Sequence, residues 1–167
     1  MNIIPYEPPM RQAALDLALR AWSPVFPQLK AAVPGFVYGA FYPEEWQKRQ
    51  LSDLGQILDN EPNTVDVAML QGQNGSETSQ LAGWVCTRIH PEDSMGEVYI
   101  LAVDPQFQRR GIGHALMNHS HDRARAAGMT MMMVETGGDP GHAPARYTYE
   151  AAGYQRWPVA RYFKNLQ

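Results

Sequence analysis

A short basic stretch with two glycines carries the clearest chemistry in this sequence. Residues 108–113 read Gln-Arg-Arg-Gly-Ile-Gly. Glycine at the start of a helix lets a phosphate group approach the backbone, where the first N–H groups have no partner within the helix. The helix dipole and the side chains of Arg109 and Arg110 add positive charge. The spacing predicts an anion-binding turn, although a tight turn with close helix packing gives the same pattern.

The turn differs from two common nucleotide-binding motifs. No Gly-Lys-Ser or Gly-Lys-Thr follows it, as a P-loop requires, and the three glycines of a dinucleotide fingerprint are missing. The sequence also has no Gly-x-Ser-x-Gly nucleophile elbow. A nucleotide-binding protein is therefore the weaker alternative.

The flanking sequence predicts how this turn is held. Residues 98–103 read Val-Tyr-Ile-Leu-Ala-Val, an apolar and β-branched run that is typical of a strand. Pro105 then marks a turn. After Gly113, no proline or glycine occurs until Gly128, which leaves room for about four helical turns. The predicted order is strand, turn, basic loop and helix.

Two stretches resemble the GCN5-related N-acetyltransferase (GNAT) superfamily. Val103-Asp104-Pro105 followed by residues 108–113 resembles its coenzyme-A signature, Val-x-Pro and then Gln-x-x-Gly-x-Gly at the start of a helix. Residues 145–154 resemble its last cofactor-side helix, in which Tyr-Glu-x-x-Gly-Tyr follows an alanine. The likeness extends over about residues 96–154.

The resemblance implies an α/β (α+β) fold, with a mixed, mainly antiparallel sheet flanked by helices, in a single domain over residues 1–167. Two central parallel strands, 97–103 and 130–135, would splay apart and hold acetyl-CoA in the gap. The backbone of strand 97–103 would pair with the pantetheine amides, and the basic turn would bind the pyrophosphate. The implied cofactor-binding residues are Leu101, Ala102, Val103, Gln108, Arg109, Arg110, Gly111, Ile112, Gly113, His114, His142, Ala145 and Tyr149. His142 stands where many members have asparagine.

The implied reaction is direct transfer of an acetyl group from acetyl-CoA to an amine. Such transfer needs a neutral amine, a polarised thioester carbonyl and a proton for the leaving thiolate. Glu97 corresponds to a catalytic glutamate of some members and is the expected base, with Glu135 or a water molecule as alternatives. Tyr149 corresponds to the tyrosine that protonates the thiolate. A non-catalytic acyl-CoA-binding sensor with the same fold is the alternative function.

Composition limits the other function classes. The 167 residues, 44% of them hydrophobic and 19% charged, match one soluble domain, and the net charge of −3 argues against nucleic acid as a partner. The single cysteine, Cys86, is expected in the core and excludes an internal disulfide. No basic–apolar leader or long apolar run occurs, so a cytoplasmic protein without membrane contact is expected. The histidines 114, 119 and 121 lack metal-binding spacing, so no metal site is expected.

The rest of the chain is expected to complete the sheet and its helices. Strands are expected at residues 2–6, 65–70, 81–89 and 161–163, and helices at 10–22, from Pro43 to 58, 111–127 and 145–152. Polar turns at 71–80 and 91–94 predict an antiparallel meander of three strands. Segment 23–42 is expected to be a broken helix whose aromatic side chains either cap the core or line an acceptor pocket. The acceptor would be a small-molecule or peptide amine, and the resemblance is compatible with a homodimer.

Overall fold

The computed structural model describes residues 1–71 and 79–166. Five strands form one sheet in the order β1-β2-β3-β4-β5. Their bounds are β1 (Asn2–Pro5), β2 (Val65–Leu70), β3 (Gln80–His90), β4 (Met95–Val103) and β5 (Met131–Val134). The first four strands pair antiparallel, and β5 pairs parallel to β4. The predicted mixed sheet and its antiparallel meander are confirmed.

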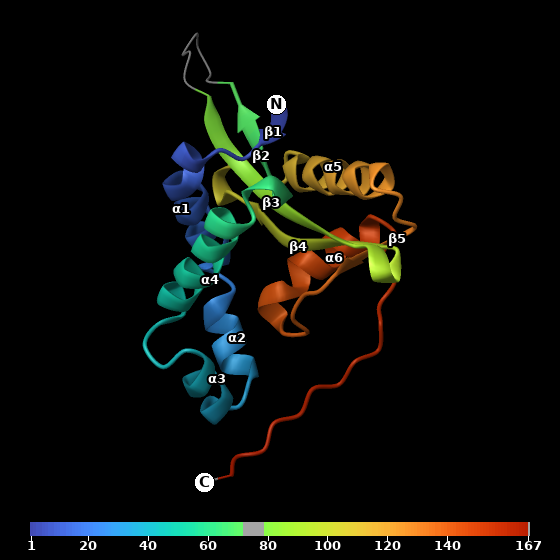
Figure 1. Cartoon of the computed structure of the whole chain (residues 1–167). Helices are drawn as coiled ribbons and strands as arrows, with labels where there is room; N and C mark the ends of the chain where they lie inside the picture. The colour runs from blue at the N-terminus through green and yellow to red at the C-terminus, as the bar shows by residue number, and fades with distance from the viewer. Residues whose placement is uncertain (72–78, 167) are drawn as a thin grey trace.

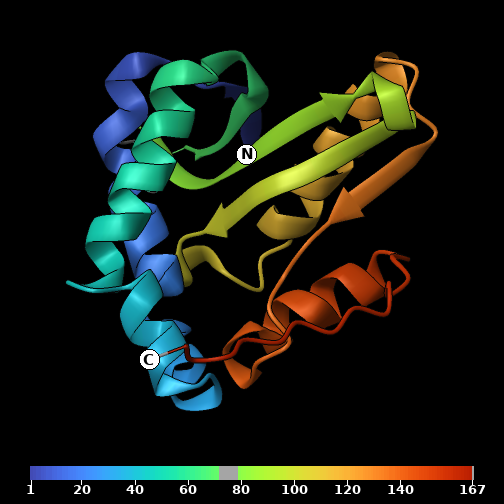
Figure 2. The same cartoon turned by 60° about the horizontal axis from the view of Figure 1, so that its bottom comes forward.

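Helices cover both faces of the sheet (Figure 1). Their bounds are α1 (Arg11–Trp22), α2 (Phe26–Ala32), α3 (Gly35–Phe41), α4 (Trp46–Asn60), α5 (Ile112–Ala126) and α6 (Ala143–Ala151). The helices α1 and α4 pack together over one face, and α5 covers the other. The helices α2 and α3 lie beyond one end of the sheet, and α6 lies beside β5 (Figure 2). Within the described residues, no helix is both long and apolar enough to cross a membrane.

The alternation of side chains along β3 divides the core into two layers. Trp84 is fully buried on the α1 and α4 side, where its indole N–H donates to the Ala14 carbonyl at 3.1 Å. Its neighbour Val85 points the opposite way and packs with Leu116 of α5. Cys86 is buried in the first layer, as expected. The sheet therefore packs against α1 and α4 on one face and against α5 on the other.

The strand β4 changes its pairing halfway along. The register against β3 shifts at Tyr99, which becomes an extra residue in a β-bulge. The strand β5 pairs only with residues 95–98. In the described part of the chain, residues 99–103 therefore have no strand on the β5 side, and the two strands diverge toward their carboxyl ends (Figure 2). This is the splay that the resemblance implies.

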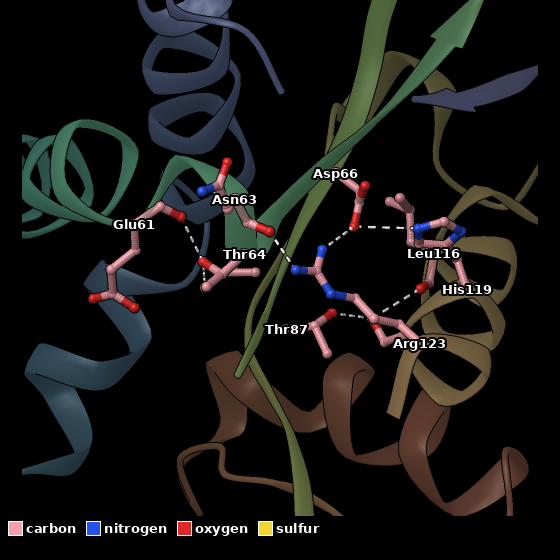
Figure 3. A network of polar contacts seen from close by, with 10 residues as sticks. Glu61, Asn63, Thr64, Asp66, Thr87, Leu116, His119 and Arg123 are labelled. Carbon is pink, nitrogen blue, oxygen red and sulfur yellow. Dashed lines mark hydrogen bonds and ion pairs between the residues drawn. The ribbon is translucent and has the colours of Figure 1, made fainter. Parts of the chain in front are cut away.

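A polar network holds α5 against β2 (Figure 3). Asp66 is 4% exposed and accepts a hydrogen bond from Nη1 of Arg123 at 2.9 Å. Nε2 of His119 lies 3.2 Å from the same carboxylate oxygen. Arg123 also donates to the carbonyl of Asn63. These contacts hold the middle and last turns of α5 against β2.

The predicted start of α4 is wrong. Pro43 was expected as the first helical residue, but α4 begins at Trp46, after Glu45 in an extended conformation. The aromatic ring of Trp46 stacks on Phe26 of α2 with centroids 4.1 Å apart. Arg49 also donates to the carbonyl of Phe41 at the end of α3. These contacts set the start of α4 beyond the proline.

The C-terminal strand expected at 161–163 is also wrong. Arg161 lies 3.4 Å from Glu135, and the ring of Phe163 packs edge-on against Phe41 of α3. These contacts direct the segment toward α3 instead of along the sheet (Figure 2).

The methionine run at 131–133 predicts a buried strand, but β5 lies at the sheet edge and Met131 is 52% exposed. Most of the turn expected at 71–80 lies outside the described residues.

Candidate functional site

The basic turn has the backbone shape that an anion site needs. Arg109 and Gly111 both adopt left-handed conformations, with φ of 60° and 81°. The carbonyl of Gly111 accepts the first helical N–H, from Ala115, at 2.9 Å. The N–H groups of residues 112–114 therefore lack helical partners. A Cβ atom on Gly111 would meet nothing within 4 Å, so the space beside the turn is open.

Side chains around the turn divide into two groups. The side chain of Ile112 is buried in the core, with the residue 2% exposed, so only its backbone can contribute to a site. Gly113 faces Val103, whose Cγ2 would lie 3.6 Å from an added Cβ atom. The side chains that are exposed at the turn are Gln108, Arg109, Arg110 and His114. The exposed group is polar or basic, which suits a phosphate-bearing ligand.

Asp104 stabilises the start of the basic turn. Its side chain is almost completely buried and accepts a hydrogen bond from the N–H of Gln106 at 3.0 Å. Nη2 of Arg20, on α1, donates to the same carboxylate at 2.6 Å. These contacts tie the end of β4 to α1 across the sheet. The sequence analysis missed Arg20, because nothing in its local pattern shows which distant carboxylate it meets.

The free edge of β4 faces the splayed gap. The N–H of Asp104 donates to the Ala82 carbonyl of β3 at 2.9 Å. Because successive strand residues direct their backbone groups to opposite sides, those of Val103 and Leu101 point toward the gap, whereas those of Ala102 point toward β3. Gln108 donates to the Val103 carbonyl at 3.2 Å. The Val103 N–H and both backbone groups of Leu101 thus remain for an extended ligand.

His142 lies at the start of α6 and is fixed by a buried carboxylate. Its Nδ1 lies 2.6 Å from Oδ2 of Asp139, whose side chain is 5% exposed. The other Asp139 oxygen accepts the N–H of Gly141 at 2.9 Å. This leaves Nε2 of His142 as the ring atom available to a ligand. Ala145, half-buried, follows in the first turn of α6.

Tyr149 lies seven residues after His142, roughly 10 Å along the helix and on the same face. Its ring packs edge-on against Tyr154, with centroids 6.1 Å apart, and the Tyr154 hydroxyl bonds to Nε2 of His121 on α5 at 2.8 Å. Burial raises the pKa of Tyr149, and burial followed by the nearby Tyr149 raises the pKa of Tyr154 to about 12. Tyr149 is therefore protonated at neutral pH and can donate a proton.

Glu97 lies on the opposite sheet face from α5, next to a histidine that the sequence analysis missed. Nε2 of His90 lies 2.8 Å from Oε2 of Glu97, whose side chain is 13% exposed. The hydrogen bond to Glu97 raises the pKa of His90, more than partial burial lowers it. The signal was present in principle, because the 91–94 turn joins the two strands into a hairpin and places residues 88, 90 and 97 on one face.

Arg88 lies opposite Glu97 in the pairing of β3 with β4. Arg88 donates to both oxygens of Glu61, at 2.7 and 2.9 Å, and its Cζ lies over the Tyr99 ring, 3.4 Å from the centroid. A cavity of about 250 Å³ opens at this point between α4 and the β4 bulge. It is lined by Asp53, Gln56, Ile57, Asn60, Glu61, Arg88 and Tyr99. The lining is mainly polar, which suits a ligand with hydrogen-bonding groups.

The alternative base and the aromatic segment lie elsewhere. Glu135 is 77% exposed and contacts only Arg161 among the described residues. In the aromatic segment, Phe26 is buried and caps the core, whereas Tyr38 and Tyr42 line a separate cavity of about 500 Å³ with Trp46. Phe26 thus confirms the core-capping expectation, and whether the second cavity takes an acceptor stays a prediction. The structure brings Glu97 together with His90 and Tyr149 together with Tyr154, and no contact in the described residues links the two groups.

The chain is similar in sequence to known acetyltransferases. The chain is 26% identical over 148 residues to a mycothiol acetyltransferase of Rhodococcus jostii (strain RHA1), covering 85% of the chain and 47% of the relative. It thus spans about half the length of that relative.

Two solved structures share the fold. The ribosomal-protein-S18-alanine N-acetyltransferase of Escherichia coli has a TM-score of 0.57 and 23% identity, with 99% of this chain and 84% of that chain covered. The PaiA N-acetyltransferase of Thermoplasma acidophilum, solved with coenzyme A, has a TM-score of 0.59 and 11% identity, with 90% and 87% covered. Residues 36–154, which include β4, the basic turn and α6, match the acetyltransferase (GNAT) family. The chain belongs to this family.

Proposed function

We propose that this protein transfers an acetyl group from acetyl-CoA to an amine by direct attack of the amine on the thioester. One observation carries the proposal. The unpaired edge of β4 leads into a left-handed, glycine-containing turn whose first helical N–H groups are free. An extended ligand ending in a pyrophosphate matches both features, because its amides can pair with the strand and its charge with the turn.

Residues on both sides of the gap would hold the donor. The Leu101 backbone and the Val103 N–H would pair with the pantetheine arm, and residues 109–114 would bind the pyrophosphate. His142 would offer Nε2 where relatives offer an asparagine amide. Tyr149, protonated at neutral pH, would give its proton to the leaving thiolate.

The acceptor is expected on the α4 side of β4. Glu97, Tyr99 and the polar cavity beside Arg88 share that face, and Glu97 would take up the proton that the ammonium group loses. The acidic residues that could place negative charge near the acceptor are Glu44, Glu45, Glu97, Glu135 and Asp139. They do not form a free acidic surface, because four of these five have basic partners. Those pairs are Glu44 with Lys48, Glu97 with His90, Glu135 with Arg161 and Asp139 with His142. We therefore propose a small-molecule or peptide amine with hydrogen-bonding groups instead of a strongly cationic one.

Titration calorimetry and thiol release test the proposal. Gly113→Glu places bulk and negative charge at the turn, although an added Cβ atom alone would fit beside Val103. We expect this variant to lose coenzyme A binding while its thermal unfolding stays cooperative. Gly35→Glu adds the same side chain at the exposed start of α3, where a Cβ atom meets nothing within 4 Å, and is the matched control.

The second arm measures thiol release from acetyl-CoA with a panel of amines. We expect release that depends on the amine. Coenzyme A binding without any amine-dependent release would instead favour the non-catalytic sensor, and unchanged affinity in Gly113→Glu would reject the assigned turn.

A further inference from the structure

His90 is the one titratable side chain in hydrogen-bond contact with Glu97 in the described part of the chain. We propose that His90 and Glu97 work as one proton-accepting pair, in which Glu97 meets the acceptor ammonium and His90 receives the proton and releases it to solvent. This inference rests on the proposed acetyl transfer and names the route of its first proton.

The geometry gives the two residues different positions. The Glu97 side chain is 13% exposed and that of His90 is 30% exposed, so the histidine is the member with better access to water. Nε2 of His90 is directed at Oε2 of Glu97 at 2.8 Å, within hydrogen-bond distance. The second oxygen of Glu97, Oε1, has no hydrogen-bond partner among the described residues and is available to an amine or to a bridging water.

A glutamate alone is a poor acceptor for this proton. Its ordinary pKa near 4 lies far below that of an ammonium group, about 10 for a lysine-like amine, so little of the glutamate would be protonated at neutral pH. Transfer onward to an imidazole produces an ion pair between the imidazolium and the carboxylate. The pair therefore accepts a proton more readily than either of its members would alone.

In the part of the chain that the structure describes, three charged groups lie near His90 and affect its pKa. Glu97 on β4 is the closest, and Glu92 in the 91–93 turn lies 3.6 Å from Nδ1. Both carboxylates favour the protonated ring, whereas the positive charge of Arg88 on β3 opposes it. Their combined effect raises the pKa of His90.

The proton transfer is balanced without a further reactant. An N–H bond of the acceptor ammonium breaks, and its electron pair becomes the nucleophile. The proton passes through the Glu97 carboxyl group to Nε2 of His90, where a new N–H bond forms. The carboxylate is regenerated, and the imidazolium later loses a proton to water at its exposed edge.

NMR titration of the histidine rings tests the pair without an acceptor. We expect the pKa of His90 to fall in Glu97→Gln, because the neutral amide no longer stabilises the imidazolium. Steady-state kinetics of His90→Gln test the route itself. Glutamine can still donate a hydrogen bond to Glu97 but cannot titrate, so we expect kcat to fall about tenfold or more, the KM for acetyl-CoA to hold, and the His90 ionisation to vanish from the pH profile of kcat.

Two further variants separate proton transfer from structure. His90→Ala should regain activity when free imidazole is added, which a structural role would not produce. His119→Gln removes the histidine paired with Asp66 on the other face of the sheet and is the matched control, with parental kcat and pH profile expected.

The outcomes distinguish a failure of the proton relay from a failure of the proposed acetyl transfer. If the parent acetylates an amine while His90→Gln keeps the parental rate and pH profile, the relay is wrong and the acetyltransferase stands. If the parent releases no thiol with any amine, both fail together. An unchanged His90 titration in Glu97→Gln would also reject the pair.

Discussion

Two histidine–carboxylate pairs lie on opposite faces of the same sheet and have different surroundings. On the α5 face, one oxygen of Asp66 lies against both His119 and Arg123, and the Asp66 side chain is 6% exposed (Figure 3). On the α4 face, Glu97 contacts His90 alone among the residues that the structure describes, its side chain is 13% exposed, and it lies two residues before the bulge at Tyr99.

The difference separates a structural carboxylate from a chemically available one. Arg123 stays charged at any working pH and donates a hydrogen bond to the Asp66 oxygen beside which His119 also lies. Glu97 has one partner, itself titratable, and an oxygen without a partner in the described residues. The residue types are alike, but the first pair holds α5 against the sheet, whereas the surroundings of the second are those that our proposed proton transfer requires.

Among the substitutions that test this comparison, Glu97→Gln is expected to have the largest effect, on kcat. It keeps the shape of the side chain and removes the base, so we expect kcat to fall on the order of a hundredfold, with acetyl-CoA affinity preserved. Steady-state kinetics at saturating acetyl-CoA measure it. A near-parental rate would move the base to Glu135 or to water.

Tyr149→Phe removes the proposed acid from the other side of the gap. We expect a loss on the order of a hundredfold in kcat with modest loss of coenzyme A affinity. Because burial raises the pKa of Tyr149, the falling limb of the parental pH–rate profile should lie above about pH 10. If the variant keeps its rate, the thiolate leaves without a proton from this residue.

Asp66→Ala tests the structural pair. It leaves Arg123 and His119 without their shared carboxylate, so we expect the free energy of unfolding to fall by about 2 kcal/mol. Urea denaturation measures this loss. The kcat per folded molecule should stay within about twofold of the parent, and a loss as large as that of Glu97→Gln would erase the distinction between the two faces.

The smallest effect concerns the pH dependence of stability. The pKa of His90 is raised in the folded protein, so the pair stabilises the fold fully below the unfolded pKa of histidine and loses this contribution as pH rises through the folded value. The melting temperature of His90→Gln should therefore fall below that of the parent at about pH 6 and approach it at about pH 9. A difference that is constant with pH would show that the pair does not titrate as proposed.

Most of the fold was predictable because its signals are local. The run before Asp104 and the glycines at 111 and 113 predicted strand, turn and helix, and the structure has all three. The strand expected at 161–163 failed because its contacts, Arg161 with Glu135 and Phe163 with Phe41, join segments far apart in the chain. The helix start predicted at Pro43 was wrong for a related reason, since the stack of Trp46 on Phe26 sets where α4 begins.

The sequence by itself determined the family, the basic turn and the candidate residues, because each depends on a short motif whose backbone conformation follows from its own residues. Only the tertiary structure decided which partner each candidate has. It paired Glu97 with His90, left Glu135 exposed and joined Tyr149 to Tyr154. Those pairings depend on strand register and helix packing, in which a shift of one residue turns a side chain to the other face. The turn at 91–94 indicated that the two strands pair, but their exact register came only from the structure, so Glu97 could be named from the sequence as a candidate base and its contact with His90 could not.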